Sequence, residues 1–289
     1  MTGTKKQNQL PADIVLDRWV NIFFTLALVF IFILSGDAQD HQRILIGIGL
    51  AAIVCTVAFI INWLTIDGAV SAGIFGSIAY GLGGLTGAAI VLGFFISGSV
   101  ISDRYISKEG FLEKSFRRDG KQVWSNGFWF TLWIIIWFLS GSHAFMIAAV
   151  TAVSVSTSDT WATEIGEKRI KGKTRLITTW KKVTPGTEGG ISFWGTLAAI
   201  FGAFFIALLY WLFSPVSSLA ATGMISLIGF SGCILDSYLG ALFQNQDYAF
   251  SFGLSDGKEN AYVSNNFVNW ASAGAASLIS LILTLIIGV

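Results

Sequence analysis

The residues best suited to chemistry are acidic side chains that interrupt apolar segments. Asp159 lies in SVSTSDTWATEIG (154–166) and Asp236 in GFSGCILDSYLGALFQNQ (229–246), and small residues flank each of them. An ionisable residue in or at the end of a membrane helix is energetically costly and usually marks a site. Carboxylates from two segments could bind Mg²⁺, which prefers carboxylates together with phosphate oxygens of a substrate. We therefore predict that Asp159 and Asp236 are catalytic residues and metal ligands. The alternative is a solvated or capping carboxylate at a helix end.

Glu164 is a third candidate catalytic residue, five positions after Asp159. On a straight helix with 3.6 residues per turn, five positions separate two side chains by about 140°. Both carboxylates can bind one ion only if the helix breaks between them. Otherwise Glu164 makes a separate contact.

The segment KKVTPGTEGGIS (181–192) has the composition of a phosphate-binding loop. Its proline and glycines allow backbone N–H groups to turn toward an anion. It also precedes an apolar segment, whose helix N-terminus would favour phosphate. The phosphate-binding candidates in this loop are Lys181, Lys182, Thr184, Gly186, Thr187, Gly189, Gly190 and Ser192. The chain has no GxxxxGK[ST] pattern, which excludes a P-loop mechanism.

Further nucleotide or phosphate contacts are expected from two other polar regions. Arg117 and Arg118 end the segment 103–122, which could form a short amphipathic helix on the membrane or a cover for the site. The asparagine candidates are Asn126, Asn265, Asn266 and Asn269. Two alternatives stay open: an Asn at a helix start is most often an N-cap, and basic loops can simply reflect membrane orientation.

The composition identifies the broad class of protein. Of 289 residues, 54% are hydrophobic and 12% charged, with a mean hydropathy of +0.69. Soluble domains average about 25% charged residues. We therefore expect an all-α, multi-pass integral membrane protein, located in the cell membrane (the inner membrane in a bacterium). No nucleic-acid partner is expected, and the sequence leaves the oligomeric state open.

Nine apolar segments are candidates for spanning helices, since a span needs roughly 20 residues. They are 14–34, 43–64, 68–82, 84–102, 123–140, 143–159, 191–213, 217–236 and 267–288. The third and fourth are glycine-rich and could form one broken element, which would reverse every later orientation. We expect one membrane domain with a two-helix N-terminal part (1–66) and a core (67–289) that contains loops 103–122 and 167–190.

The distribution of basic residues predicts the orientation, because Lys and Arg are enriched in cytoplasmic loops. With nine crossings and a cytoplasmic N-terminus, all of the 18 basic residues except Arg43 lie in the cytoplasm. The C-terminus is then outside. The acidic candidates, the 181–192 loop and the asparagine clusters all fall on the cytoplasmic face.

Four segments, in order, resemble motifs of an integral membrane family known as domain of unknown function 92. SDTWATEIG (158–166) resembles the family's ADTWASEIG, RRDGKQVWSNG (117–127) its basic segment before Asn-Gly, TPGTEGGIS (184–192) its PGTNGGVS, and SGCILDSYLGALFQ (231–244) its GSLLDSLLGATLQ. The resemblance extends from about residue 65 to the C-terminus. Two positions differ: Glu188 stands where the family commonly has Asn, and Ser158 where it has Ala.

The resemblance implies a function, because the family includes phytyl-phosphate kinases. It implies a Mg²⁺-dependent enzyme that transfers a phosphoryl group from a nucleoside triphosphate, CTP or another, to a prenyl monophosphate at the cytoplasmic membrane surface. Its partners would be the nucleotide, the prenyl-phosphate lipid and the surrounding membrane lipids. Two other functions stay open: an ion-coupled transporter of lipids or small molecules, which would place acids near mid-membrane, and a cytidylyltransferase, which would release pyrophosphate.

Overall fold

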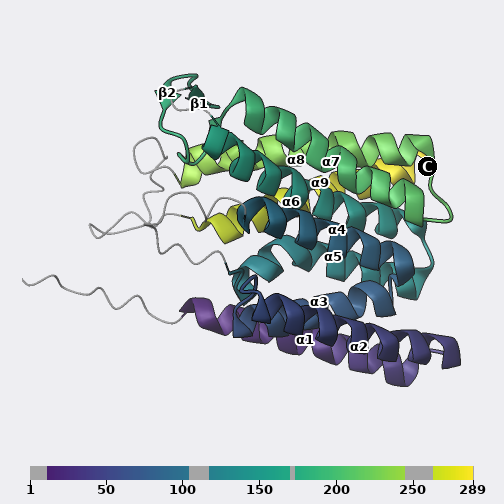
Figure 1. The fold of residues 1–289 in the computed structure, drawn as a ribbon. Coiled ribbons are helices and arrows are strands. Elements are labelled where there is room, and N and C mark those ends of the chain that lie inside the picture. Colours follow the sequence, from purple (N-terminus) through teal and green to yellow (C-terminus); the bar gives the residue numbers. More distant parts are fainter. Residues whose placement is uncertain (1–11, 104–116, 170–172, 245–262, 289) are drawn as a thin grey trace, which may run out of the picture.

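The computed structural model describes residues 12–103, 117–169, 173–244 and 263–288. In these residues nine α-helices lie side by side (Figure 1). They are α1 Ala12–Leu34, α2 Ala38–Ile60, α3 Ile66–Gly81, α4 Gly84–Asp103, α5 Gly120–Ser140, α6 His143–Arg169, α7 Phe193–Phe213, α8 Leu219–Phe243 and α9 Asn265–Ile287. The predicted all-α membrane architecture is confirmed.

Consecutive helices run in opposite directions, so the start of α1 and the end of α9 lie at opposite ends of the bundle (Figure 1). We call the end where α6 and α8 finish and α7 and α9 begin the sheet end, because a small β-sheet lies there. Every predicted site residue belongs to a segment at or near this end.

Seven of the helices in the described residues are long and apolar enough to cross a membrane. The other two are α3 and α6. With 16 residues, α3 is about 24 Å long, less than the roughly 30 Å of a bilayer core. Helix α6 is long but contains charged and hydroxyl residues. It packs against α4, α5, α7, α8 and α9, so most of its surface contacts protein rather than lipid.

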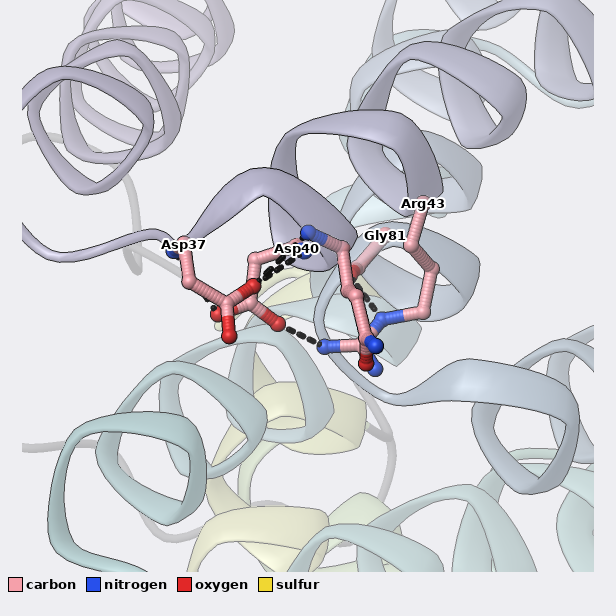
Figure 2. A network of polar contacts seen from close by, with 5 residues as sticks. Asp37, Asp40, Arg43 and Gly81 are labelled. Carbon is pink, nitrogen blue, oxygen red and sulfur yellow. Dashed lines mark hydrogen bonds and ion pairs between the residues drawn. The ribbon is translucent and has the colours of Figure 1, made fainter.

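The α3 and α4 segments form two separate helices joined at Leu82 and Gly83. Arg43 of α2 fixes this turn, because its Nε donates to the carbonyl of Gly81 at 2.8 Å (Figure 2). The same guanidinium forms an ion pair with Asp40, at 2.6 Å. Asp37, the N-cap of α2, completes a capping box with Asp40. The one basic residue expected outside thus ties the start of α2 to the α3–α4 turn.

The segment predicted as loop 167–190 contains regular structure that the sequence did not indicate. Helix α6 continues to Arg169, and three short strands follow: β1 Thr174–Leu176, β2 Lys182–Val183 and β3 Gly190–Ile191. They form an antiparallel sheet in the order β2-β1-β3, with Thr174 opposite Val183 and Arg175 opposite Ile191. Strands of two or three residues carry too little alternation to be recognised in the sequence.

Small residues bring α6, α7 and α8 close together, as is common where helices pack in lipid. A Cβ at Gly202 of α7 would lie 3.1 Å from the Cα of Ser158. A Cβ at Gly229 of α8 would lie 2.7 Å from the Cβ of Ser154 and would overlap its Oγ. The hydroxyls on α6 bond across these contacts: Ser158 donates to the carbonyl of Ala199 at 2.8 Å. This close approach places the polar part of α6 beside α8.

We predict that Gly229→Ala destabilises the protein by about 1–3 kcal/mol, the usual cost of overpacking. Gly223→Ala on the same helix is the control, because a Cβ there meets no atom within 4 Å. This control should leave stability unchanged or raise it by up to about 1 kcal/mol, because Ala favours helix over Gly. Thermal unfolding in detergent, followed by tryptophan fluorescence, measures both. Equal melting temperatures for the two variants would contradict the close α6–α8 packing.

The predicted orientation can be tested with single cysteines. Thr179 at the sheet end and Val216 between α7 and α8 are exposed, whereas the native Cys55 and Cys233 are buried. A membrane-impermeant maleimide should label Thr179→Cys only in inverted vesicles and Val216→Cys only in right-side-out vesicles. The reverse pattern would place the sheet end outside the cell.

Candidate functional site

The structure brings Asp159 of α6 and Asp236 of α8 together between the helices. Their carboxylates are close enough to interact electrostatically. The predicted segments end at these two residues, but α6 continues for ten residues beyond Asp159 and α8 for seven beyond Asp236. Seven residues of helix correspond to about 10 Å. The acids therefore lie inside the helix bundle, about two helical turns from the end of α8, rather than at the helix ends.

Helix α9 holds the carboxylate of Asp236. Asp236 is buried, and its Oδ2 accepts a hydrogen bond from Ser272 Oγ at 2.7 Å. With its amide nitrogen toward the same oxygen, Asn269 donates at 3.2 Å and also bonds to the carbonyl of Asn265. Asn269, predicted to contact nucleotide, thus contacts the catalytic candidate itself. Both donors use Oδ2, and in the described part of the chain Oδ1 is the oxygen that remains for another ligand.

Asp159 has a different environment. Its side chain is partly buried, and its carboxylate accepts no hydrogen bond from any residue in the described part of the chain. The neighbouring Ser158 donates its hydroxyl to α7, not to Asp159. A carboxylate in this position requires a cation, a proton or water to compensate its charge.

Glu188, which was absent from the predicted site, contributes a third carboxylate that interacts with both Asp159 and Asp236. The loop that carries it packs directly on α8: a Cβ at Gly189 would lie 2.6 Å from the backbone of Ala241. Glu188 Oε2 approaches Gly240, at 3.8 Å from where a Cβ would be. The sequence showed only that a charge replaces the family's usual Asn. The packing of the loop on α8, which gives that charge its position, had no sequence signal.

The 184–192 loop is built from two tight turns. Thr184-Pro185-Gly186-Thr187 closes with a 3.2 Å bond from Thr187 N to Thr184 O, and Gly186 has a φ of 85°. The next turn closes with Gly190 N to Thr187 O at 2.8 Å, with Gly189 at a φ of 74°. Both glycines occupy the left-handed position that a type II turn requires.

These turns change part of the predicted phosphate contacts. The N–H groups of Thr187 and Gly190 are used inside the turns, so the expectation that they face an anion is wrong. Ser192 is the N-cap of α7, where its Oγ accepts from Gly195 N at 3.1 Å. Lys181 and Lys182 are exposed on the sheet.

Arg118 lies at the sheet end with its guanidinium over the ring of Phe94 of α4, 4.9 Å from the centroid. Burial lowers the pKa of this guanidinium to about 10 and the carboxylate of Glu164 raises it, so Arg118 is cationic at neutral pH. Helix α6 has no break between Asp159 and Glu164. As the helical geometry required, the two acids interact with different partners: Asp159 with Asp236, and Glu164 with Arg118. Arg117 is exposed.

The asparagine candidates are not helix caps. Asn126 lies within α5, where its Nδ2 donates to the carbonyl of Gln122 at 2.8 Å, and Asp119 is the N-cap. Ser264 caps α9. The N-cap alternative is therefore wrong for both clusters. The site residues placed near α9 also include Asn265, which is exposed, and Asn266, which is partly buried.

The residues present fit a Mg²⁺ site that is completed by its substrate. Among the described residues, no group of three or more His, Cys, Asp or Glu converges closely enough to hold a metal alone. Mg²⁺ commonly uses one or two carboxylates and takes its remaining ligands from phosphates and water. Asp159 and Asp236 supply that kind of incomplete set of hard oxygen ligands.

Comparison with known proteins supports the resemblance found in the motifs. The profile of the family described as "Integral membrane protein DUF92" matches residues 49–277, a start within α2 that precedes residue 65. The chain is 31% identical to the uncharacterized membrane protein MJ0933 of Methanocaldococcus jannaschii, over 67% of this chain and 82% of that protein. It is 34% identical to the uncharacterized membrane protein sll0875 of Synechocystis, over 60% of this chain and 69% of that protein.

A more distant relative comes from a plant. Identity to "Protein VTE6, chloroplastic" of Arabidopsis thaliana is 29%, over 51% of this chain and 47% of that protein. No solved structure matches the chain.

We predict that Mg²⁺ stabilises the protein through the acidic pair. Binding to the folded state alone contributes about 2.7 kcal/mol at a concentration 100 times the Kd, so millimolar Mg²⁺ should raise the melting temperature. Asp159→Asn combined with Asp236→Asn should abolish the increase. Asp119→Asn is the matched control, because Asn also caps a helix well, and it should respond like wild type. A Mg²⁺ response that persists in the double variant would exclude this site.

Proposed function

The chain belongs to the integral membrane family DUF92, and from this membership and the site geometry we propose that it is a membrane-embedded lipid-phosphate kinase. The enzyme transfers the terminal phosphoryl group of a nucleoside triphosphate, CTP or a similar nucleotide, to an isoprenoid monophosphate of the phytyl type. The products are an isoprenoid diphosphate and a nucleoside diphosphate. The reaction takes place at the sheet end, on the cytoplasmic face in the predicted orientation.

The single observation that carries this proposal is the pairing of Asp159 and Asp236 from two separate helices. Two aspartates in a mostly apolar bundle place two negative charges close together in an environment where even one isolated charge is energetically costly. Such a cluster is favourable when it binds a cation that in turn binds phosphates. The motif resemblance to a family that includes phytyl-phosphate kinases, and the distant similarity to VTE6, support the same class of reaction.

Phosphoryl transfer requires positioning and charge neutralisation more than covalent help from the protein. Bound Mg²⁺ would supply neutralisation of the nucleotide's phosphates. Asp159 and Asp236 would hold it, and Ser272 and Asn269 orient Asp236 through its Oδ2. Arg118 supplies a fixed positive charge near α6. An oxygen of the lipid phosphate attacks the terminal phosphorus, a new P–O bond forms, and the bond to the β-phosphate's bridging oxygen breaks.

Glu188 sets a limit on where phosphates can lie. Its carboxylate interacts electrostatically with both aspartates. It would repel a phosphate that has no bound cation. Glu188 would therefore favour a cation bound by the two aspartates rather than a phosphate. The basic residues of the sheet, Lys181 and Lys182, are exposed and can meet the nucleotide from the water.

We predict that purified protein with Mg²⁺ converts a prenyl monophosphate to the diphosphate with at least one nucleoside triphosphate. A matrix of four nucleotides labelled at the γ-phosphate against prenyl phosphates of several lengths gives the measurement. Labelled lipid diphosphate supports the kinase. A nucleotide–lipid adduct with released pyrophosphate would instead show a cytidylyltransferase, and no turnover by folded protein would refute both enzymes.

In the same assay Asp159→Asn and Asp236→Asn should each fall below a tenth of wild-type turnover, a loss greater than 1.4 kcal/mol of transition-state stabilisation. Asp119→Asn should remain active. More than a tenth of wild-type activity in both site variants would show that the two aspartates are structural.

A further inference from the structure

An apolar cavity lies between α2, α3 and α4 and reaches the start of α5, and neither Asp159 nor Asp236 lines it. Its volume is about 110 Å³. The wall from α2 includes Gly47 and Ala51, the wall from α3 includes Ala72 and Phe75, and the wall from α4 includes Ala88. None of these three helices carries a predicted catalytic residue, and the cavity meets the site described above only at Arg118.

One end of the cavity is polar. Arg118 and Gln122 line it together with Leu64, and these residues lie at the sheet end. The backbone of Arg118 is fixed there: its N–H donates to Trp63 O at 2.9 Å, and its carbonyl accepts from Thr65 N at 3.2 Å. Gly68 permits this contact, because a Cβ at that position would overlap the carbonyl of Arg118. An arginine is thus held at the mouth of an apolar cavity.

The same arginine also faces the acidic helix. Its guanidinium lies over the rings of Phe94 and Phe95, at 4.9 and 5.9 Å from their centroids. It lies against Gly98, whose Cβ position is 3.3 Å from Cγ2 of Thr160, the residue that follows Asp159. Arg118 therefore stands between the cavity and the part of α6 that carries Asp159.

We propose that this cavity binds the phosphate-proximal part of a single isoprenoid chain, and that Arg118 binds the lipid's phosphate. The inference rests on the proposed lipid-phosphate substrate and deepens it by stating how the acceptor lies. A cationic side chain that cannot lose its proton at neutral pH is matched to an anionic head group. The apolar walls are matched to a hydrocarbon chain, so the two ends of the cavity suit the two ends of such a lipid.

The size of the cavity restricts the lipid class. One water-sized probe needs about 10–15 Å³, so 110 Å³ has room for roughly eight carbon-sized groups. An isoprene unit has five carbons, so this space corresponds to between one and two isoprene units of one chain. The rest of the chain would leave between the helices into the bilayer. A phosphatidate, with two acyl chains joined close to its phosphate, does not fit this space.

A second apolar cavity provides a matched comparison. It has a volume of about 950 Å³ and lies between α1, α2 and α3. Ala69 of α3 lines this larger cavity and Ala72, three residues later, lines the smaller one. Both alanines are partly buried. No charged residue is among those that line the larger cavity, so it offers nothing for a phosphate.

The test uses a prenyl monophosphate that carries a photoreactive diazirine in its first isoprene units. Ultraviolet light should crosslink it to residues of α2, α3 or α4 that line the smaller cavity, as mapped by mass spectrometry of peptides. Ala72→Phe fills that cavity and should reduce labelling at least tenfold. Ala69→Phe should label like wild type. Labelling that is unchanged in Ala72→Phe, or that maps to the larger cavity, overturns the proposal.

Thermal unfolding of each variant separates occlusion from loss of the fold, and Ala88→Phe fills the same cavity from α4 if Ala72→Phe is unstable. Unlabelled prenyl phosphate should compete with the probe, whereas phosphatidate should not. Competition by phosphatidate at equal concentration overturns the restriction to one chain.

The role of Arg118 has its own test in the same competition. Wild type should prefer prenyl phosphate over the corresponding prenyl alcohol at least tenfold, and Arg118→Gln should lose this preference. Lys121→Gln, a change of charge three residues away, should keep it. A preference that survives in Arg118→Gln overturns the assignment of the phosphate.

Labelling requires binding but no phosphoryl transfer, so the two proposals can fail separately. Specific labelling of the smaller cavity without turnover with any nucleotide would sustain the binding site and refute the kinase. Turnover together with labelling outside the smaller cavity would support the kinase and refute the binding site.

Discussion

The structure depends on one constraint: α6 carries hydroxyl and acidic side chains into the middle of an apolar bundle. Lipid could not tolerate this helix at its surface, because uncompensated polar groups are costly in hydrocarbon. Five other helices surround it, and its hydroxyls bond to backbone carbonyls: Ser154 to Ala203, Ser158 to Ala199, and Thr157 to Val153 within α6. The close contacts at Gly202 and Gly229 allow α7 and α8 to approach near enough for these bonds.

The burial of α6 has a direct chemical consequence. Once α8 packs against it, Asp236 comes beside Asp159, and α9 orients Asp236 through Ser272 and Asn269. The sheet that follows α6 places Glu188 on α8, where it joins the same cluster. Arg118, held by the α2–α3 connection, lies on the other side of α6 near Glu164. Helix α6 therefore contributes to both charged groups: Asp159 interacts with the acidic residues, and Glu164 interacts with Arg118.

Much of this arrangement could be read from the sequence, because apolar length and charge spacing are strong signals in membrane proteins. Hydropathy predicts the helices and the end of the bundle where the site residues lie. The rotation of 100° per residue along a helix predicts that Asp159 and Glu164 point in different directions. The ends of α6 and α8 could not be predicted, because polar residues that continue a buried helix look like the end of a span. The short strands and the position of Glu188 depend on contacts between distant segments. The N-cap expectation failed because Ser264 and Asp119 cap these helices instead. In the phosphate loop, the N–H groups of Thr187 and Gly190 bond to turn carbonyls, and the other contacts stay predictions.

The central claim is that Asp159 and Asp236 together bind a divalent cation that also binds nucleotide phosphates. Electron paramagnetic resonance of Mn²⁺, with a non-hydrolysable nucleotide, tests it most directly. We predict one bound Mn²⁺ per chain with resolved ³¹P hyperfine coupling, and loss of that signal in both Asp159→Asn and Asp236→Asn. Mn²⁺ that binds equally well to both variants, or that shows no coupling to phosphorus in the wild type, would contradict the account.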